Sequence, residues 1–177
     1  MKIVIMSDSH LKNETVLSII EKHPDATCFI HCGDVGCEIQ LPEDKSVYLV
    51  KGNNDFLDLP WDQEVMINNT KIFITHDHRY HVDISLDELK KQAEENHYQI
   101  VCYGHTHDPK WQQSGGCYFI NPGSVSFPRG GRIFVPTYCI FEDGIIHYYH
   151  AKTHECVDHL FEPKKKVSFW KRLFKKQ

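Results

Sequence analysis

Short apolar runs alternate with amphipathic segments through the first hundred residues. The runs that predict buried strands are residues 2–6, 27–30, 47–50 and 100–102. Residues 65–67 and 72–74 are predicted to form a hairpin, because the Asn68–Asn69 pair between them is typical of a tight turn.

Two segments between these runs have the pattern of amphipathic helices. Asn13 is the predicted N-cap of a helix that continues to about His23. Ser85 and Glu88 have the spacing of a capping box, which predicts a helix ending near His97. Because a helix between two strands is typical of parallel sheets, we expect the first half of the chain to be a wound α/β structure.

The pattern changes after residue 107 to short alternating runs separated by Gly-rich or acidic turns. The expected strands are residues 117–120, 133–141 and 145–149, and they favour an antiparallel sheet. The stretch Asn121-Pro122-Gly123-Ser124 predicts a tight turn that can present the side chains of Asn121 and Ser124. Two mixed sheets packed face to face would accommodate both halves, which makes the fold class α/β.

Charge divides the chain into a body and a tail. The 177 residues suit one domain, expected at residues 1–162, followed by a basic tail at residues 163–177. The tail holds seven Lys or Arg and no acidic residue. In a helix, Phe169 and Leu173, like Trp170 and Phe174, would share a face opposite the cationic one, which predicts weak contact with an anionic membrane. An unstructured basic tail is the alternative.

The body is strongly acidic, because it carries all 24 Asp and Glu residues and only the remaining 13 basic ones. We therefore expect no stable nucleic-acid partner. The seven cysteines are odd in number and contain no Cys-x-x-Cys pair, and the apolar run after Lys2 lacks the features of a signal peptide. These features predict reduced thiols and a cytoplasmic protein.

Side chains that commonly bind metals follow five of the predicted strands. Two histidines stand two residues apart after Gly104, which lets the chain bend. In α/β sheets the segments after the carboxyl ends of strands converge, so we expect the following residues to lie together: Asp8, His10, Asp34, Asn53, His76, His105 and His107. Seven nitrogen and oxygen donors exceed one tetrahedral site but suit two ions bridged by a carboxylate. Without thiolate, the set favours manganese, iron or nickel over structural zinc.

The motifs built from these residues resemble the calcineurin-like metallophosphoesterases, in particular their small bacterial and archaeal phosphodiesterase branch. The matching motifs are Asp8-Ser9-His10, Gly33-Asp34, Gly52-Asn53-Asn54-Asp55, Thr75-His76-Asp77-His78 and Gly104-His105-Thr106-His107. The resemblance covers about residues 1–150, including the turn at residues 121–124. It implies a four-layer α/β/β/α sandwich of two mixed β-sheets flanked by helices.

The resemblance also implies roles for the seven residues. One divalent ion would be bound by Asp8, His10, Asp34 and His107, and the other by Asp34, Asn53, His76 and His105. The implied catalytic residues are Asp34, which bridges the ions, and Asn53 and His105, which orient the phosphate. We expect manganese, with nickel, iron or zinc as alternatives.

Such a site predicts a binuclear enzyme that hydrolyses small phosphodiesters by attack of a hydroxide held between the ions. The chain departs from the family pattern at Asn54, where many members have a histidine that meets the leaving group. The general acid is therefore left open, with His78 as the first candidate. Asp77 stands where glycine is common, as tolerated backbone or as a carboxylate that supports the ligands.

Other interpretations remain at this stage. A catalytically weak scaffold, like the related retromer subunit, is disfavoured by the intact ligand set, and a nuclease-like enzyme is disfavoured by the acidic body. A monomer and a homo-oligomer are both left open. Arg129 either contacts phosphate or stays at the surface. The late histidines are expected at the surface rather than in a second metal site with Cys156: His147, His150, His154 and His159.

Overall fold

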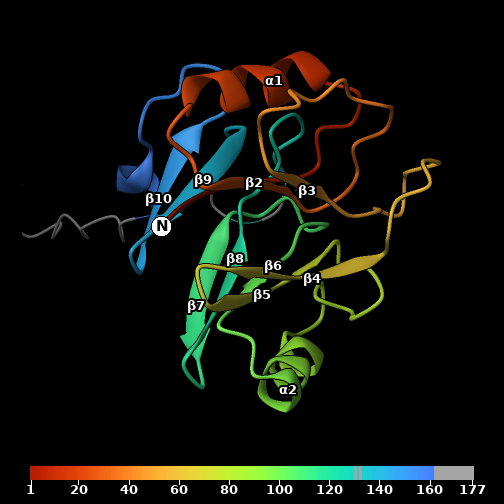
Figure 1. The fold of residues 1–177 in the computed structure, drawn as a ribbon, viewed down its shortest axis with the longest axis vertical. Helices are drawn as coiled ribbons and strands as arrows, with labels where there is room; N and C mark the ends of the chain where they lie inside the picture. Colours follow the sequence, from red (N-terminus) through yellow and green to blue (C-terminus); the bar gives the residue numbers. More distant parts are fainter. Residues whose placement is uncertain (130, 132, 162–177) are drawn as a thin grey trace, which may run out of the picture.

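Two mixed β-sheets of five strands lie face to face, and one helix covers each outer face (Figure 1). The computed structural model describes residues 1–129, 131 and 133–161, so the predicted tail lies outside the described part of the chain. The expected α/β/β/α arrangement is confirmed, with each outer layer reduced to a single α-helix in the described residues.

The chain forms three strands of the first sheet, then all five strands of the second, and returns to complete the first. The first sheet contains, in spatial order, β10 (Ile145–His150), β9 (Thr137–Glu142), β1 (Lys2–Met6), β2 (Cys28–His31) and β3 (Val47–Leu49). The second contains β4 (Asp62–Ile67), β5 (Thr70–Thr75), β6 (Ile100–Cys102), β8 (Cys117–Asn121) and β7 (Lys110–Ser114). The helices are α1 (Asn13–Lys22), α2 (Asp87–Asn96) and the 3-10 helix η1 (Asp158–Leu160). Within the described residues, none of these helices has the length and apolar character that crossing a bilayer requires.

Three apolar clusters hold the layers together. Strand side chains alternate in direction, so one face of each sheet contributes to the core between the sheets, which includes Ile5, Ile30 and Ile74. The opposite face of the first sheet packs against Val16, Ile19 and Ile20 of α1, and that of the second against Leu89 and Ala93 of α2. The sheets therefore have two buried faces, which explains why their central strands are apolar throughout.

The late strands differ from the sequence prediction. They do not form one antiparallel sheet: β7 and β8 complete the second sheet, whereas β9 and β10 complete the first. Only β8 pairs in parallel, with β6, and this pairing extends the parallel part of the second sheet. The strand expected at residues 133–141 begins at Thr137, because Pro136 has no N–H to donate and restricts the residue before it. By contrast, the hairpin at Asn68 and Asn69 is confirmed, with a positive φ at both residues.

Neither predicted helix cap is formed. Asn13 is the first residue of α1, and its amide donates to the carbonyl of Glu38 at 2.9 Å, so it ties the helix to the loop after β2. Helix α2 begins at Asp87, and the Ser85 hydroxyl accepts from the N–H of Asp87 at 3.3 Å without a reciprocal bond from Glu88. A tertiary contact therefore replaces the predicted cap at Asn13, whereas Ser85 makes a local bond outside the capping box.

His23 lies at the junction between α1 and the first sheet. Its ring nitrogen Nε2 is 2.9 Å from the hydroxyl of Tyr138, and the residue is 8% exposed. Burial, assisted by the charge of Lys2, lowers the pKa of His23 to about 4. The imidazole is therefore neutral in the folded protein at pH values where it is protonated in the unfolded chain.

Acidification between pH 6.5 and 4 should consequently destabilise the fold through His23. The unfolded chain binds one more proton there than the folded one, so the unfolding free energy should decrease by up to about 1.4 kcal/mol per pH unit from this group. H23Q keeps a polar partner for Tyr138 but cannot titrate. Urea unfolding at several pH values should give a shallower pH dependence for H23Q than for the wild type. Parallel pH profiles for the two proteins would contradict this assignment.

Candidate metal centre

The loops after the carboxyl ends of parallel strands carry all seven side chains predicted from the sequence. Strands β1, β2 and β3 run parallel in the first sheet, and β5 and β6 run parallel in the second. Contacts of 3.7 Å or less link the seven side chains into one continuous series. In order along this series they are Asp8, His107, His10, Asp34, His76, Asn53 and His105.

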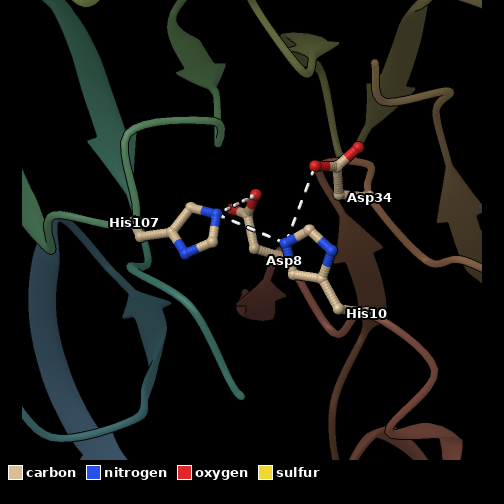
Figure 2. Close-up of side chains that lie close together, drawn as sticks. All are labelled: Asp8, His10, Asp34 and His107. Atoms are coloured by element: carbon tan, nitrogen blue, oxygen red, sulfur yellow. Dashed lines mark hydrogen bonds and ion pairs between the residues drawn. The ribbon is translucent and has the colours of Figure 1, made fainter. Parts of the chain in front are cut away.

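The first donor group consists of Asp8, His10, Asp34 and His107, which converge from three loops (Figure 2). One ligand atom from each lies within 4.8 Å of the others. The Nε2 atom of His107 is 3.1 Å from Oδ1 of Asp8 and 3.3 Å from Nε2 of His10. The Nε2 atom of His10 is in turn 3.7 Å from Oδ2 of Asp34. The group offers nitrogen and oxygen donors and no sulfur.

The second donor group surrounds the side-chain oxygen of Asn53. Nε2 of His76 lies 3.1 Å from this oxygen, and Nδ1 of His105 lies 3.0 Å from it. Nε2 of His76 is also 3.5 Å from Oδ2 of Asp34. The same oxygen of Asp34 therefore faces one imidazole of each donor group, His10 and His76.

Backbone carbonyls orient two of the imidazoles. Nδ1 of His76 donates to the carbonyl of Cys32 at 2.7 Å, and Nδ1 of His107 donates to the carbonyl of Phe127. Each of these bonds leaves the lone pair of Nε2 directed at the donor groups. Metal-binding histidines are commonly oriented in this way, with the second nitrogen donating to a carbonyl.

Asp8 gives the clearest evidence that the site suits a cation. Its carboxylate is completely buried, and neither oxygen accepts a hydrogen bond from the described residues. Burial is the largest influence on its pKa and raises it, but His107 and His76 together outweigh burial and lower the pKa. A buried, ionised carboxylate without hydrogen bonds is costly unless a cation neutralises it. The residues present therefore fit divalent metal ions.

The backbone at the ligands is largely left-handed. Five of the seven positions have positive φ: Asp8 (55°), His10 (43°), Asp34 (56°), His105 (66°) and His107 (59°). The bend that the sequence attributed to Gly104 thus occurs at the histidines after it. A side chain at Gly104 is excluded for another reason, because its Cβ would lie 2.1 Å from Oγ of Ser7. A Cβ on Gly52 would likewise lie 2.1 Å from Oδ1 of Asp34.

Asn54 has a structural role that the sequence did not reveal. Its backbone N–H donates to Oδ1 of Asp34 at 2.8 Å, and its side-chain amide donates to Oδ2. Asp55 next to it accepts from the N–H groups of Gly36 at 2.6 Å and Gly52 at 2.8 Å. Residues 52–55 therefore hold the loop after β2, and Asp34 with it, against the loop after β3.

The turn at residues 121–124 supports the ligands instead of presenting side chains to a substrate. The amide of Asn121 donates to the carbonyl of Gly104 at 2.8 Å, on the segment that carries His105. The hydroxyl of Ser124 donates to the carbonyl of Asp8 at 2.8 Å. Sequence reasoning identified the turn and its two presented side chains, and the structure shows which backbone carbonyls they bind.

The structure shows the surroundings of the residues whose roles the sequence left undecided. Nη2 of Arg129 lies 3.1 Å from Nε2 of His107, so the guanidinium reaches the site. The ring of His78 lies 5.8 Å from that of His76, and His31 is buried with Nε2 3.0 Å from the hydroxyl of Ser9. Asp77 is buried, and its oxygens have no hydrogen-bond partner among the described residues. Burial, together with the charges of Asp62 and Asp83, raises the pKa of Asp77 to about 9, so it is protonated at neutral pH.

Comparison with protein families gives a match over residues 1–143 to the calcineurin-like phosphoesterase superfamily domain. A probable metallophosphoesterase of Bacillus subtilis, YsnB, is 34% identical over 134 residues, which are 75% of this chain and 79% of the relative. The phosphodiesterase MJ0936 of Methanocaldococcus jannaschii is 30% identical over 144 residues, which are 70% of this chain and 83% of the relative.

Solved structures show the same fold. A conserved uncharacterized protein of Streptococcus pneumoniae, described as a predicted phosphoesterase, superposes with a TM-score of 0.80 at 30% identity, covering 88% of this chain and 92% of its own. Vacuolar protein sorting 29 of Cryptosporidium parvum superposes with a TM-score of 0.64 at 15% identity, covering 88% and 94%. The second likeness concerns the fold alone.

The close approach at Gly104 predicts a specific effect of G104A. The new methyl group would displace the segment of His105 and His107 from Ser7, so the unfolding free energy should fall by about 1–3 kcal/mol and divalent ions should bind more weakly. G116A is the matched control, because a Cβ there meets nothing within 4 Å, although its φ of +82° adds backbone strain. Chemical unfolding and calorimetric metal titration provide the measurements. Equal metal affinity in the two variants would refute the packing argument.

Proposed function

The chain belongs to the calcineurin-like phosphoesterase superfamily, and from this premise we propose that it is a binuclear phosphodiesterase acting on small phosphodiesters. Membership makes it a metal-dependent phosphoesterase; the number of ions and the preference for diesters are our proposals. The observation that carries the binuclear proposal is the position of Asp34 Oδ2, which lies 3.7 Å from His10 Nε2 and 3.5 Å from His76 Nε2. One carboxylate oxygen between two donor groups suits a bridging ligand.

In this proposal Asp8, His10 and His107 bind one ion and Asn53, His76 and His105 bind the other, with Asp34 shared. Bound divalent ions would activate a water molecule and neutralise negative charge on the phosphate. The protein supplies the geometry for this chemistry. Asn54 fixes both oxygens of Asp34, and the carbonyls of Cys32 and Phe127 fix the ring planes of His76 and His107.

Substrate orientation is assigned to side chains at the edge of the donor groups. Arg129 reaches His107 and carries a planar, permanently charged group suited to bidentate contact with phosphate oxygens. Asn53 and His105 lie on the other side of Asp34, where the resemblance to the family assigns them to orienting phosphate. Holding the phosphate from both sides would align it for in-line attack.

Two observations support diesters as substrates. Asn54 occupies the position where many family members have a histidine, and its side-chain amide donates to Asp34. It therefore cannot deliver a proton to a leaving group. Aromatic rings flank the donor groups: Phe127 stands edge-on to His10 at 5.6 Å, and Trp61 lies 5.4 Å from His78. Phe127 and Trp61 are 54% and 42% exposed, which leaves apolar surface for the second ester group.

We also place the enzyme in the cytoplasm. All seven cysteines are free, and five of them are buried in the apolar core. Free thiols are typical of proteins in a reducing compartment such as the cytoplasm.

The first test concerns Asp34. Protein loaded with manganese should retain close to two ions per chain, whereas D34A should lose both ions or all activity, because a bridging carboxylate supports both donor groups. D44A is the control, because this carboxylate is 75% exposed and forms its ion pair with Lys45, which is not one of the seven donors. Elemental analysis after gel filtration measures the content. A single ion per chain that D34A leaves in place would sink the binuclear proposal.

The second test concerns Asn54. Wild-type protein should prefer an aryl diester such as bis-p-nitrophenyl phosphate over alkyl monoesters, because phenolate leaves without a proton donor. N54H should raise the ratio of monoester to diester turnover, with an upper limit of about 10² to 10⁴ for a well-placed general acid. N54A also loses the side-chain hydrogen bond to Asp34 but gains no general acid. Its ratio of monoester to diester turnover should therefore stay at the wild-type value. Faster hydrolysis of alkyl monoesters by the wild type would show that another residue, first of all His78, acts as the acid.

A further inference from the structure

A second cluster of metal-binding side chains lies on the edge strand of the first sheet. It consists of His147 in β10, Cys156 beyond it and Asp158 at the start of η1. One ligand atom from each lies within 4.8 Å of the other two. Nδ1 of His147 is 2.6 Å from Oδ2 of Asp158. No residue of this cluster belongs to the metal centre described above.

After β10 the chain reverses, and the segment around Cys156 runs back along the strand, which fixes the cluster. Cys156 pairs with Tyr149 in an antiparallel bridge, and the N–H of Val157 donates to the carbonyl of Tyr148 at 2.8 Å. The N–H of Tyr148 donates to Oδ1 of Asp158 at 2.7 Å. One oxygen of Asp158 is thus held by backbone, and the other is directed at His147. A carboxylate oriented by a hydrogen bond in this way is typical of metal ligands.

Cys156 differs from the other cysteines of the chain. Five of the seven are buried, and burial raises the pKa of each of their thiols, to about 12 for Cys28 and Cys117. Cys37 is partly buried, with Nδ2 of Asn13 3.1 Å from its sulfur. Cys156 alone is exposed, and it is the one that lies beside an imidazole and a carboxylate.

Two of the other late histidines, His150 and His154, are already engaged. Nδ1 of His150 accepts from the N–H groups of Lys152 and Thr153, and both ring nitrogens of His154 lie within 3.3 Å of hydroxyl groups. His147 differs because its only partner among the described residues is Asp158, itself a member of the cluster. The sequence interpretation, which grouped the late histidines together as surface residues, did not separate it from the others.

We propose that His147, Cys156 and Asp158 form a surface site for a zinc-type transition-metal ion, separate from the catalytic centre. Thiolate, imidazole and carboxylate are all common zinc ligands, and a water molecule can complete the tetrahedron. The thiolate and the carboxylate together balance the charge of a divalent ion. Binding releases the thiol proton of Cys156 to solvent, and His147 binds the ion through Nδ1 as the tautomer that carries its proton on Nε2.

The ion would connect strand β10 to the segment that follows it. Phe161 at the end of that segment stacks on Tyr148 at 4.3 Å between ring centroids. The segment is already attached by this stacking, by the burial of Val157 in the core between the sheets and by backbone hydrogen bonds. An ion bound to His147 on one side and to Cys156 and Asp158 on the other would fasten η1 to the sheet edge, as structural zinc sites do in small domains.

Cobalt absorption tests the proposal, because a bond between cobalt and thiolate produces an intense near-ultraviolet band that nitrogen and oxygen ligands do not. Reduced full-length protein is first saturated with Mn²⁺ and then titrated with Co²⁺. Because cobalt displaces manganese from nitrogen and oxygen donors, it is added until both sites are filled. The wild type should then show the band, and C156S should lack it. H147A and D158N should weaken cobalt binding at least about tenfold. C37S, which removes the other accessible sulfur, should keep the band unchanged.

Zinc protection of the thiol gives a second readout that does not depend on cobalt. Zn²⁺ should slow alkylation of Cys156, measured by mass spectrometry, and leave the rate at Cys37 unchanged. Absence of the cobalt band from the wild type, or its persistence in C156S, would overturn the proposal. Equal protection of both cysteines by zinc would also overturn it, because it would indicate nonspecific binding to thiols.

Discussion

The metal centre depends on backbone contacts too close for a side chain. Gly52 lies against Asp34, which joins the loops after β2 and β3 within the first sheet. Gly104 lies against Ser7, which joins the loop after β6 of the second sheet to the loop after β1 of the first. Three of the seven donors come from the second sheet and four from the first. The distances between donors are therefore set by how closely the two sheets approach, and the apolar core between them is what maintains that approach.

Five of the seven predicted donors have left-handed backbone, and this conformation raises the free energy of the folded state. Each such residue is strained by about 1–2 kcal/mol when it is not glycine. Hydrogen bonds between the loops compensate: the N–H of Asp8 donates to the carbonyl of Gly33 at 3.0 Å, and the N–H of His10 donates to that of Asp34 at 2.9 Å. The strain thus persists because the two loops hold each other, and the side chains already face one another in the described structure.

The sequence predicted which side chains converge better than it predicted the contacts that support them. Asp8, Asp34 and His76 could be identified because each stands within four residues of the end of an apolar run, and strand ends in this fold class converge. The structural role of Asn54 could not be identified in this way. In the sequence Asn54 is visible only as a departure from the family motif, and nothing there indicates that its amide donates to Asp34. The cap expected at Asn13 failed for a related reason: its polar side chain is used across the fold. Local spacing identifies residues near strand ends, whereas long-range hydrogen bonds require the three-dimensional structure.

The left-handed backbone also constrains how this site can change during evolution. Besides glycine, the residues that tolerate positive φ best are asparagine, aspartate and histidine, and these are also donors for metal ions. A mutation at Asp8, His10 or Asp34 that the chain conformation accepts will therefore often introduce another donor, whereas β-branched residues are selected against by the backbone itself. Lineages that share this loop geometry can exchange one ligand type for another, and so drift in metal preference, while the fold that carries the site is preserved.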